Sequence, residues 1–209
     1  IGKLVDFKGI IEDDLRGSSG QDERFIRMTT SNGYLNRGSM RFGASSSVYM
    51  NVPYAAGGSL YAAPIVNTFS YTAWIKIDST GQTVTWAPIV GRERAGGGGQ
   101  VAQRDLTIEG LTSDPPYGLR LRLNDAGLSI TADDVVPADQ WVFVACTYNK
   151  DAAAPQARVY ANAVLVASGT YTTAISETGA TGYYMGGSPA TTSRYLTGYL
   201  DEIKIYNRA

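Results

Sequence analysis

Tyr195 to Arg208, YLTGYLDEIKIYNR, is the stretch that decides the fold, because polar and apolar residues alternate along most of it. Alternation with a period of two is typical of a β-strand that has one buried face. Glu202 and Lys204 favour water, so we expect the odd-numbered residues, two isoleucines among them, to face the core. This phase also turns Asp201 inward. A buried carboxylate needs a partner, and backbone N–H groups, an arginine or a metal ion would each serve.

The composition favours an all-β protein. The 24 glycines and 14 tyrosines among 209 residues suit short strands joined by tight turns, and they do not suit a helical bundle. A chain of this length buries roughly 70% of the surface that it exposes when unfolded, which is enough for a sizeable core. We therefore expect one domain that spans residues 1–209.

Charge and residue usage exclude several classes of function. The net charge is −1 and only 18% of residues are charged, so we expect no nucleic-acid partner. No apolar stretch is long enough to span a bilayer, so we expect no membrane insertion. The absence of histidine excludes a Ser-His-Asp triad, a histidine general base and histidine-ligated zinc. The single cysteine, Cys146, is expected in a buried strand.

Three more stretches indicate strands. Phe69 to Ile77, FSYTAWIKI, alternates with Phe69 inward, and its tryptophan lies on the opposite face. Pro137 to Asn149 contains a nearly continuous apolar run, which favours a strand buried on both faces. Ala157 to Val166 has the pattern of a hairpin in which Asn162 adopts the left-handed turn conformation.

Two further strands are expected in the middle of the chain. One covers Thr83 to Val90 and contains Trp86. The other covers Tyr117 to Leu123, where three leucines face the core and Arg120 and Arg122 face away from it.

These stretches resemble the laminin-G-like, concanavalin A-like jelly-roll domains. Gly198 to Ala209 is similar to the closing strand of that family, G-x-[IL]-D-E-[VI]-[RK]-[IV]-[YF]-N-R-A. Phe69 to Ile77 is similar to its F-T-[VIL]-[SE]-[AF]-W-[VI]-K strand, and Trp141 to Asn149 to its W-[HYT]-[HF]-[VI]-A-x-T-[YF]-[DN] strand. Val142 stands where the family often has histidine. The resemblance implies an all-β, two-sheet antiparallel jelly roll of laminin-G type.

The same resemblance implies a non-catalytic carbohydrate-binding or adhesion module whose partner is a glycan or a cell-surface ligand. It also implies an extracellular or surface-exposed protein, virion surfaces included, although no signal peptide is visible. Among the residues, Arg92 and Arg94 precede a run of four glycines and could grip a carboxylate. Tyr61 and Tyr117 are expected in exposed loops, where they could stack on sugar rings. Loop residues of these types are usually plain solvated surface.

An acidic loop suggests a calcium site. Asp13 and Asp14 follow a first strand expected at Lys3 to Gly9, and pairing of that strand with the closing strand would bring them toward Asp201. Hard cations prefer carboxylate and carbonyl oxygens, and the resembled family often binds calcium. The loop lacks the full D-x-D-x-D-G spacing of a dedicated calcium loop, so a solvated turn is the simpler interpretation.

Two other functions stay open. A structural assembly subunit, such as a virion decoration or tail protein with neighbouring subunits as partners, is compatible with the low charge. A glycoside hydrolase or polysaccharide lyase on the same fold is less favoured, because the E-x-D-x-x-E strand of retaining glucanases is missing. A lyase site built from tyrosine and arginine remains open. Fold alone does not decide between these chemistries.

Overall fold

In the computed structural model, the part of the chain that is described consists of strands and the turns between them. No helix in the described part of the chain is long and apolar enough to cross a membrane. The residues whose structure is described are 27–29, 39–43, 49–53, 67–80, 86–94, 101–109, 115–124, 127–176, 180–188 and 194–209.

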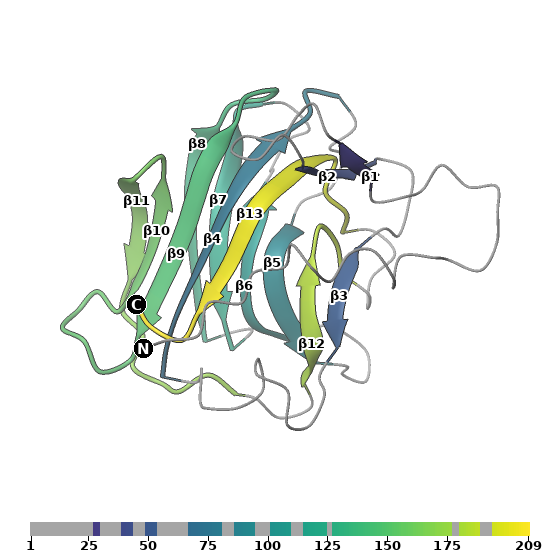
Figure 1. Ribbon diagram of the computed structural model, residues 1–209. Helices are drawn as coiled ribbons and strands as arrows, with labels where there is room; N and C mark the ends of the chain where they lie inside the picture. The colour runs from purple at the N-terminus through teal and green to yellow at the C-terminus, as the bar shows by residue number, and fades with distance from the viewer. Residues whose placement is uncertain are drawn as a thin grey trace.

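The strands form two antiparallel sheets, which confirms the two-sheet jelly roll (Figure 1). In spatial order, the seven-stranded sheet contains β1 (Arg27–Thr29), β2 (Ser39–Phe42), β13 (Gly198–Tyr206), β4 (Thr68–Ile77), β9 (Val142–Asn149), β10 (Ala157–Ala161) and β11 (Val164–Gly169). The six-stranded sheet contains β3 (Met50–Pro53), β12 (Ala180–Met185), β5 (Ala87–Arg94), β6 (Val101–Glu109), β7 (Tyr117–Leu123) and β8 (Leu128–Val136).

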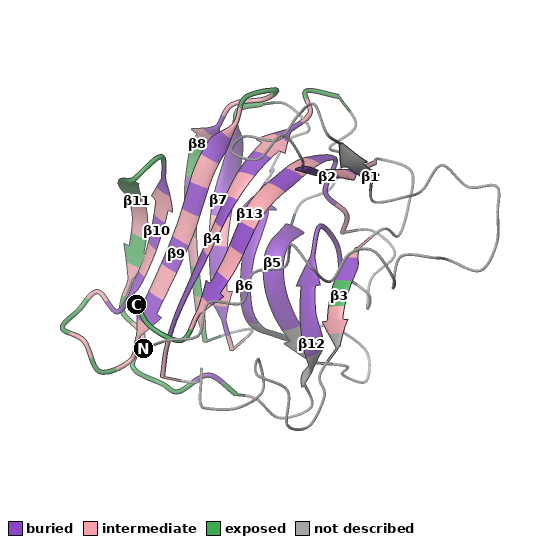
Figure 2. Ribbon diagram, viewed as in Figure 1, coloured by how far each residue is buried: buried purple, intermediate pink, exposed green. Residues whose placement is uncertain are grey.

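The core lies between the sheets and is built from the inward residues of each strand. Phe69 and the alternate residues that follow it in β4 are buried, as predicted, and so is Cys146 in β9. In β9, however, Phe143, Ala145 and Thr147 are only half-buried. The prediction that this strand is buried on both faces is therefore wrong, because one face of an antiparallel sheet can meet water. Figure 2 shows the resulting bands along β4, β9 and β13.

The closing strand β13 contains a bulge that the alternation did not predict. Asp201 lies opposite Trp74, but the next paired residue, Lys204, lies opposite Thr72, so two residues face one. Glu202 takes a left-handed φ of 48° there. The bulge changes the phase of the strand, so Ile203 is buried as expected while Asp201 and Glu202 are both half-buried.

The inward orientation predicted for Asp201 is therefore wrong. Its Oδ1 accepts a hydrogen bond of 2.8 Å from the backbone N–H of Glu202. A short side-chain acceptor of this kind compensates the backbone group that leaves the ladder at a bulge. The strand expected at Lys3 to Gly9 lies outside the described residues, so its pairing with β13 stays a prediction.

The hairpin from β10 to β11 confirms the role of Asn162. Asn162 and Ala163 have φ values of 48° and 67°, the two consecutive left-handed residues that a tight two-residue turn requires. Asn162 also holds the turn to β9, since its Oδ1 accepts a 3.0 Å hydrogen bond from the N–H of Phe143. The sequence indicated this residue because Asn tolerates the left-handed region better than most residues do.

Candidate functional site

Two of the residues expected at a ligand site lie in the interior. Arg92 is 3% exposed and belongs to β5, and Tyr117 is 1% exposed and begins β7. The Tyr117 hydroxyl donates a 2.9 Å hydrogen bond to the carbonyl oxygen of Asp78. The predicted exposure of these two side chains is wrong. β5 continues past Val90 to Arg94, and Tyr117 begins β7 facing inward with the leucines of that strand. The bulge between Pro88 and Val90 also shifts the phase of β5.

Arg92 takes part in a buried cluster with a second arginine. Arg92 pairs with Arg104 across β5 and β6, and both guanidinium carbons lie over the ring of Tyr183, at 5.5 and 5.4 Å from its centroid. Arg104 Nη2 donates a 2.7 Å hydrogen bond to the Tyr183 hydroxyl oxygen and its guanidinium lies 5.6 Å from the ring of Phe69. These contacts tie β12 to the core and serve the fold.

Four predicted site residues lie wholly or partly outside the described structure. The backbone of Arg94 ends β5 and pairs with Val101 and Ala180, but its side chain is outside the described set. Tyr61, Asp13 and Asp14 are outside it altogether. Their roles in binding a ligand or a cation stay predictions.

The outward side of the six-stranded sheet carries a cluster of arginines and carboxylates, which we call the six-strand outer face. Arg120 and Arg122 point outward from β7, as predicted. Arg122 Nη2 lies 3.4 Å from Asp105 Oδ2, and Arg120 Nη1 lies 3.3 Å from Glu109 Oε2. Both carboxylates come from β6, the neighbouring strand. The cross-strand pairs hold the two arginines in fixed positions on this face.

Trp86 completes this face and was not identified as a site residue from the sequence. It is 36% exposed and has a left-handed φ of 68°, just before β5 begins. Its indole Nε1–H donates a 2.9 Å hydrogen bond to Glu109 Oε1. The guanidinium carbons of Arg120 and Arg194 each lie 4.8 Å from its ring centroid. The ring is thus held on several sides while part of it stays open to solvent.

Asp105 is a buried carboxylate of this face, only 2% exposed. Burial raises the pKa of its carboxyl, and the nearby charges of Arg122 and Arg120 only partly oppose this rise. Gly91 lies opposite it on β5, where a Cβ atom would come within 2.9 Å of the Asp105 Cβ. Asp105 therefore occupies space that only a glycine on the neighbouring strand leaves free.

Replacement of Asp105 by asparagine should change how stability depends on pH. Because the folded pKa lies above the unfolded one, the folded state holds a proton that the unfolded state has lost, and wild-type stability falls as pH rises through this window. From about pH 4 upward, the free energy of unfolding measured in urea should rise for Asp105→Asn relative to the wild type. If the wild type gained on the variant instead, attraction to Arg122 would outweigh burial.

No group of three or more His, Cys, Asp or Glu side chains in the described part of the chain could hold a metal ion. Asp201 lies on the outward side of the seven-stranded sheet beside Glu202. The calcium site expected at Asp13, Asp14 and Asp201 stays a prediction, and calorimetric titration with calcium is its direct test.

The fold defines a class of proteins, the antiparallel jelly-roll sandwiches of concanavalin A type. Residues 47–209 match the profile of the Concanavalin A-like lectin/glucanases superfamily, in its laminin-G branch. The chain belongs to this family. The comparison with curated protein sequences gives no match.

Solved structures share this fold at low sequence identity. The CBM40 domain of the Ruminococcus gnavus IT-sialidase, bound to alpha2,3 sialyllactose, has a TM-score of 0.56 and 16% identity over 80% of this chain and 93% of that one. Domain 4 of a GH43 extracellular arabinanase from Geobacillus stearothermophilus, in complex with arabinotriose, has a TM-score of 0.56. Its identity is 16% over 98% of this chain and 81% of that one.

A candidate carbohydrate binding protein from Bacteroides ovatus has a TM-score of 0.57 and 19% identity over 78% of this chain. The chain spans 42% of that protein and 25% of the Trypanosoma rangeli sialidase, a further match with a TM-score of 0.57 and 18% identity over 81% of this chain. Likeness at these identities concerns the fold.

Proposed function

We propose that this chain is a non-catalytic carbohydrate-binding module that binds sugar on the six-strand outer face. The observation that carries the proposal is Trp86, an aromatic ring that is partly exposed and held by Glu109 and two guanidinium groups. Such a ring can stack on the apolar C–H face of a sugar. The neighbouring arginines offer donors to its hydroxyl groups.

The structural neighbours support this proposal. One is the CBM40 domain of a sialidase and one is domain 4 of an arabinanase, and each was solved in complex with an oligosaccharide. We extend the carbohydrate partner to this chain by analogy of fold together with the Trp86 site. We also propose an extracellular or surface-exposed location, as for the arabinanase.

The carboxylates of this face favour binding over catalysis. Asp105 and Glu109 are four residues apart on one strand, which separates their Cα atoms by about 13 Å. Retaining glycosidases need carboxyl groups about 5.5 Å apart, and inverting enzymes need at most about 9.5 Å. Each carboxylate is also within 3.4 Å of an arginine nitrogen. This geometry suits an oriented binding surface.

The test is a glycan array on the purified chain, followed by calorimetry with the best ligand on Trp86→Ala. We expect the loss of the stacking ring to weaken binding on the order of 30-fold, with little change in stability. Tyr206→Ala, which removes a half-buried aromatic from the other sheet, is the matched control. Silence across the array would contradict the function, and full affinity in Trp86→Ala would contradict the site.

A further inference from the structure

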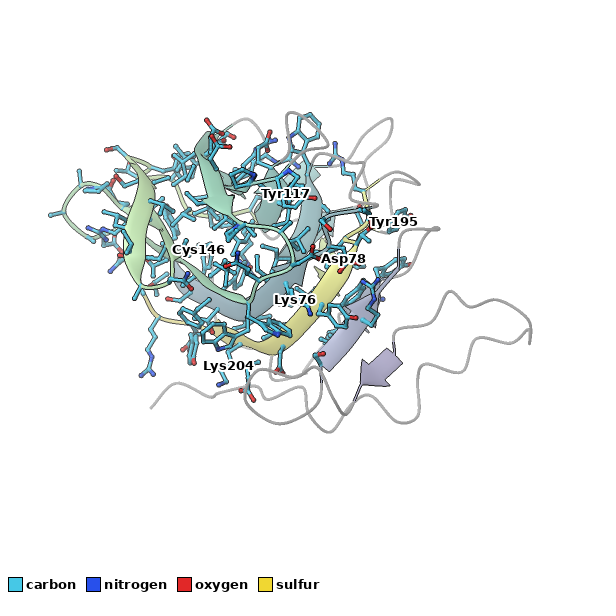
Figure 3. The ribbon with its side chains drawn as sticks, turned by 90° about the horizontal axis from the view of Figure 1, so that it is seen from above. Lys76, Asp78, Tyr117, Cys146, Tyr195 and Lys204 are labelled. Atoms are coloured by element: carbon cyan, nitrogen blue, oxygen red, sulfur yellow. The ribbon has the colours of Figure 1, made fainter. Side chains whose placement is uncertain are left out.

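The outward side of the seven-stranded sheet carries four aromatic residues. Trp74, Phe143 and Tyr199 come from the adjacent strands β4, β9 and β13, and Trp141 lies just before β9. Trp141 and Tyr199 have ring centroids 6.3 Å apart, and Trp74 and Phe143 have centroids 5.4 Å apart. All four side chains are half-buried, and they form a surface that we call the aromatic row. In Figure 3, Cys146 lies between the sheets and Lys204 lies on the outer side of this one. The row is therefore separate from Trp86, which belongs to the other sheet.

Two cations are interleaved with these rings. The Lys76 ammonium lies 4.7 Å from the centroid of the Tyr199 ring and 6.0 Å from that of Trp141. The Arg41 guanidinium lies 4.6 Å from the Tyr199 ring. Cations at these distances are attracted to the ring faces and hold the rings in place.

The two cations differ in how far their N–H donors are already paired with acceptors of the protein. Arg41 Nη2 lies 2.6 Å from Asp78 Oδ2, and its Nη1 donates hydrogen bonds to the carbonyl oxygens of Phe42 and Gly198. Arg41 is thus committed to the protein. Lys76 makes no ion pair with any residue in the described part of the chain. Asp139 lies near enough to feel its charge, but Asp139 Oδ1 accepts a hydrogen bond from the N–H of Ser79. The Lys76 ammonium is therefore the charge available to a ligand.

The acids on this side of the sheet are largely engaged. Asp201 accepts the backbone N–H of Glu202, and Glu202 Oε2 lies 2.8 Å from Lys204 Nζ. Both lie further along β13 than Tyr199, on the side of Trp74. A carboxylate that approaches between Tyr199 and Trp141 therefore meets Lys76 first.

We propose that the aromatic row is a second carbohydrate surface, specific for an acidic polysaccharide built from uronate sugars. Sugar rings stack on Trp141 and Tyr199, and one carboxylate accepts hydrogen bonds from the Lys76 ammonium. The proposal does not depend on the Trp86 site. It gives the module two glycan-binding faces, one on each sheet.

A second copy of the chain is a poorer occupant of this surface. A two-fold interface brings the same patch of both subunits together, so a contact centred on Lys76 would place the two ammonium groups near each other. Like charges that face each other at a contact are destabilising. A polyanion complements the charge of this surface, and its ring faces match the aromatic side chains.

The experiment uses short oligomers from polygalacturonate, alginate and hyaluronan, each paired with its neutral methyl ester, and measures affinity by calorimetry. We expect at least one acidic oligomer to bind, more tightly than its ester and more weakly at high salt. Lys76→Met keeps the aliphatic stem but removes the charge. It should weaken binding on the order of tenfold and erase the preference for the acid.

Matched variants locate the surface. Trp141→Ala should weaken all ligands of the row, whereas Lys204→Met, whose lysine is already paired with Glu202, should leave affinity unchanged. Trp86→Ala should also leave it unchanged. Failure of all three acidic oligomers to bind would overturn the proposal, as would full affinity in Lys76→Met. Loss of binding in Trp86→Ala would place the acidic ligand on the six-strand outer face. That result would overturn this proposal but not the proposed function. A dimer that sedimentation detects and Trp141→Ala abolishes would assign the row to self-association.

Discussion

Gly198→Ala is expected to cost about 4 kcal/mol of unfolding free energy, or to prevent folding altogether. Gly198 begins β13 with a φ of 150°, a conformation that side chains rarely adopt. An added Cβ would lie 2.2 Å from the carbonyl oxygen of Lys76 and 3.0 Å from the Cα of Ile77. Both atoms belong to the backbone of β4, so the clash cannot be relieved by rotating a side chain.

The physical cost arises from separating two paired strands. Gly198 lies between Phe42 of β2 and Ile77 of β4, so any shift of its backbone disturbs ladder hydrogen bonds on both sides. Urea unfolding with a spectroscopic readout measures the effect, together with the yield of soluble protein. Gly43→Ala is the control, because a Cβ there would meet nothing within 4 Å. A Gly198→Ala variant with the stability of Gly43→Ala would show that β13 and β4 are not this close.

The second large effect is expected for Phe69→Ala, which should lose about 3 to 5 kcal/mol of unfolding free energy. Phe69 is fully buried in β4, with its ring centroid 4.8 Å from that of Tyr71 and 5.8 Å from that of Tyr148. The guanidinium of Arg104 lies 5.6 Å from the same ring. Truncation removes the ring contacts and leaves a cavity beside a buried charge.

Thr72→Ala serves as the comparison within the same strand. Thr72 is half-buried on the outward side of the sheet, so its truncation should cost less than about 1 kcal/mol. Thermal and urea unfolding of the two variants should therefore differ widely, although the changes lie only three residues apart. Equal losses for both variants would mean that the outward side of β4 is covered as thoroughly as its inward side.

The strands could be predicted from the sequence because their main signal is local, whereas the two-sheet jelly roll was expected from the resemblance to a family. The alternation in Phe69 to Ile77 defined the inward residues of β4. Asn162 indicated the turn between β10 and β11 through its own conformational preference. Tyr117 to Leu123 likewise separated leucines from arginines correctly. Each of these inferences needs only the period of a strand or the preference of a single residue.

The candidate sites depended on contacts that the sequence does not record. A bulge at Glu202 turned Asp201 outward, and strand pairing drew Arg92 and Tyr117 into the interior. Trp86 became a site residue through Glu109, which lies 23 positions away along the chain. Patterns with a period of two cannot foresee a bulge, because its position depends on how the partner strand pairs.

The sequence by itself therefore determined the central strands and the buried faces of β4 and β7, and it excluded histidine chemistry within these 209 residues. The tertiary structure alone decided which charged and aromatic residues share a surface. Lys76 and Trp141 illustrate the difference, since they lie 65 positions apart in the chain and 6.0 Å apart in space, measured from the ammonium nitrogen to the ring centroid. The reason is physical: local preference fixes the shape of a strand, whereas long-range pairing of strands fixes which side chains meet.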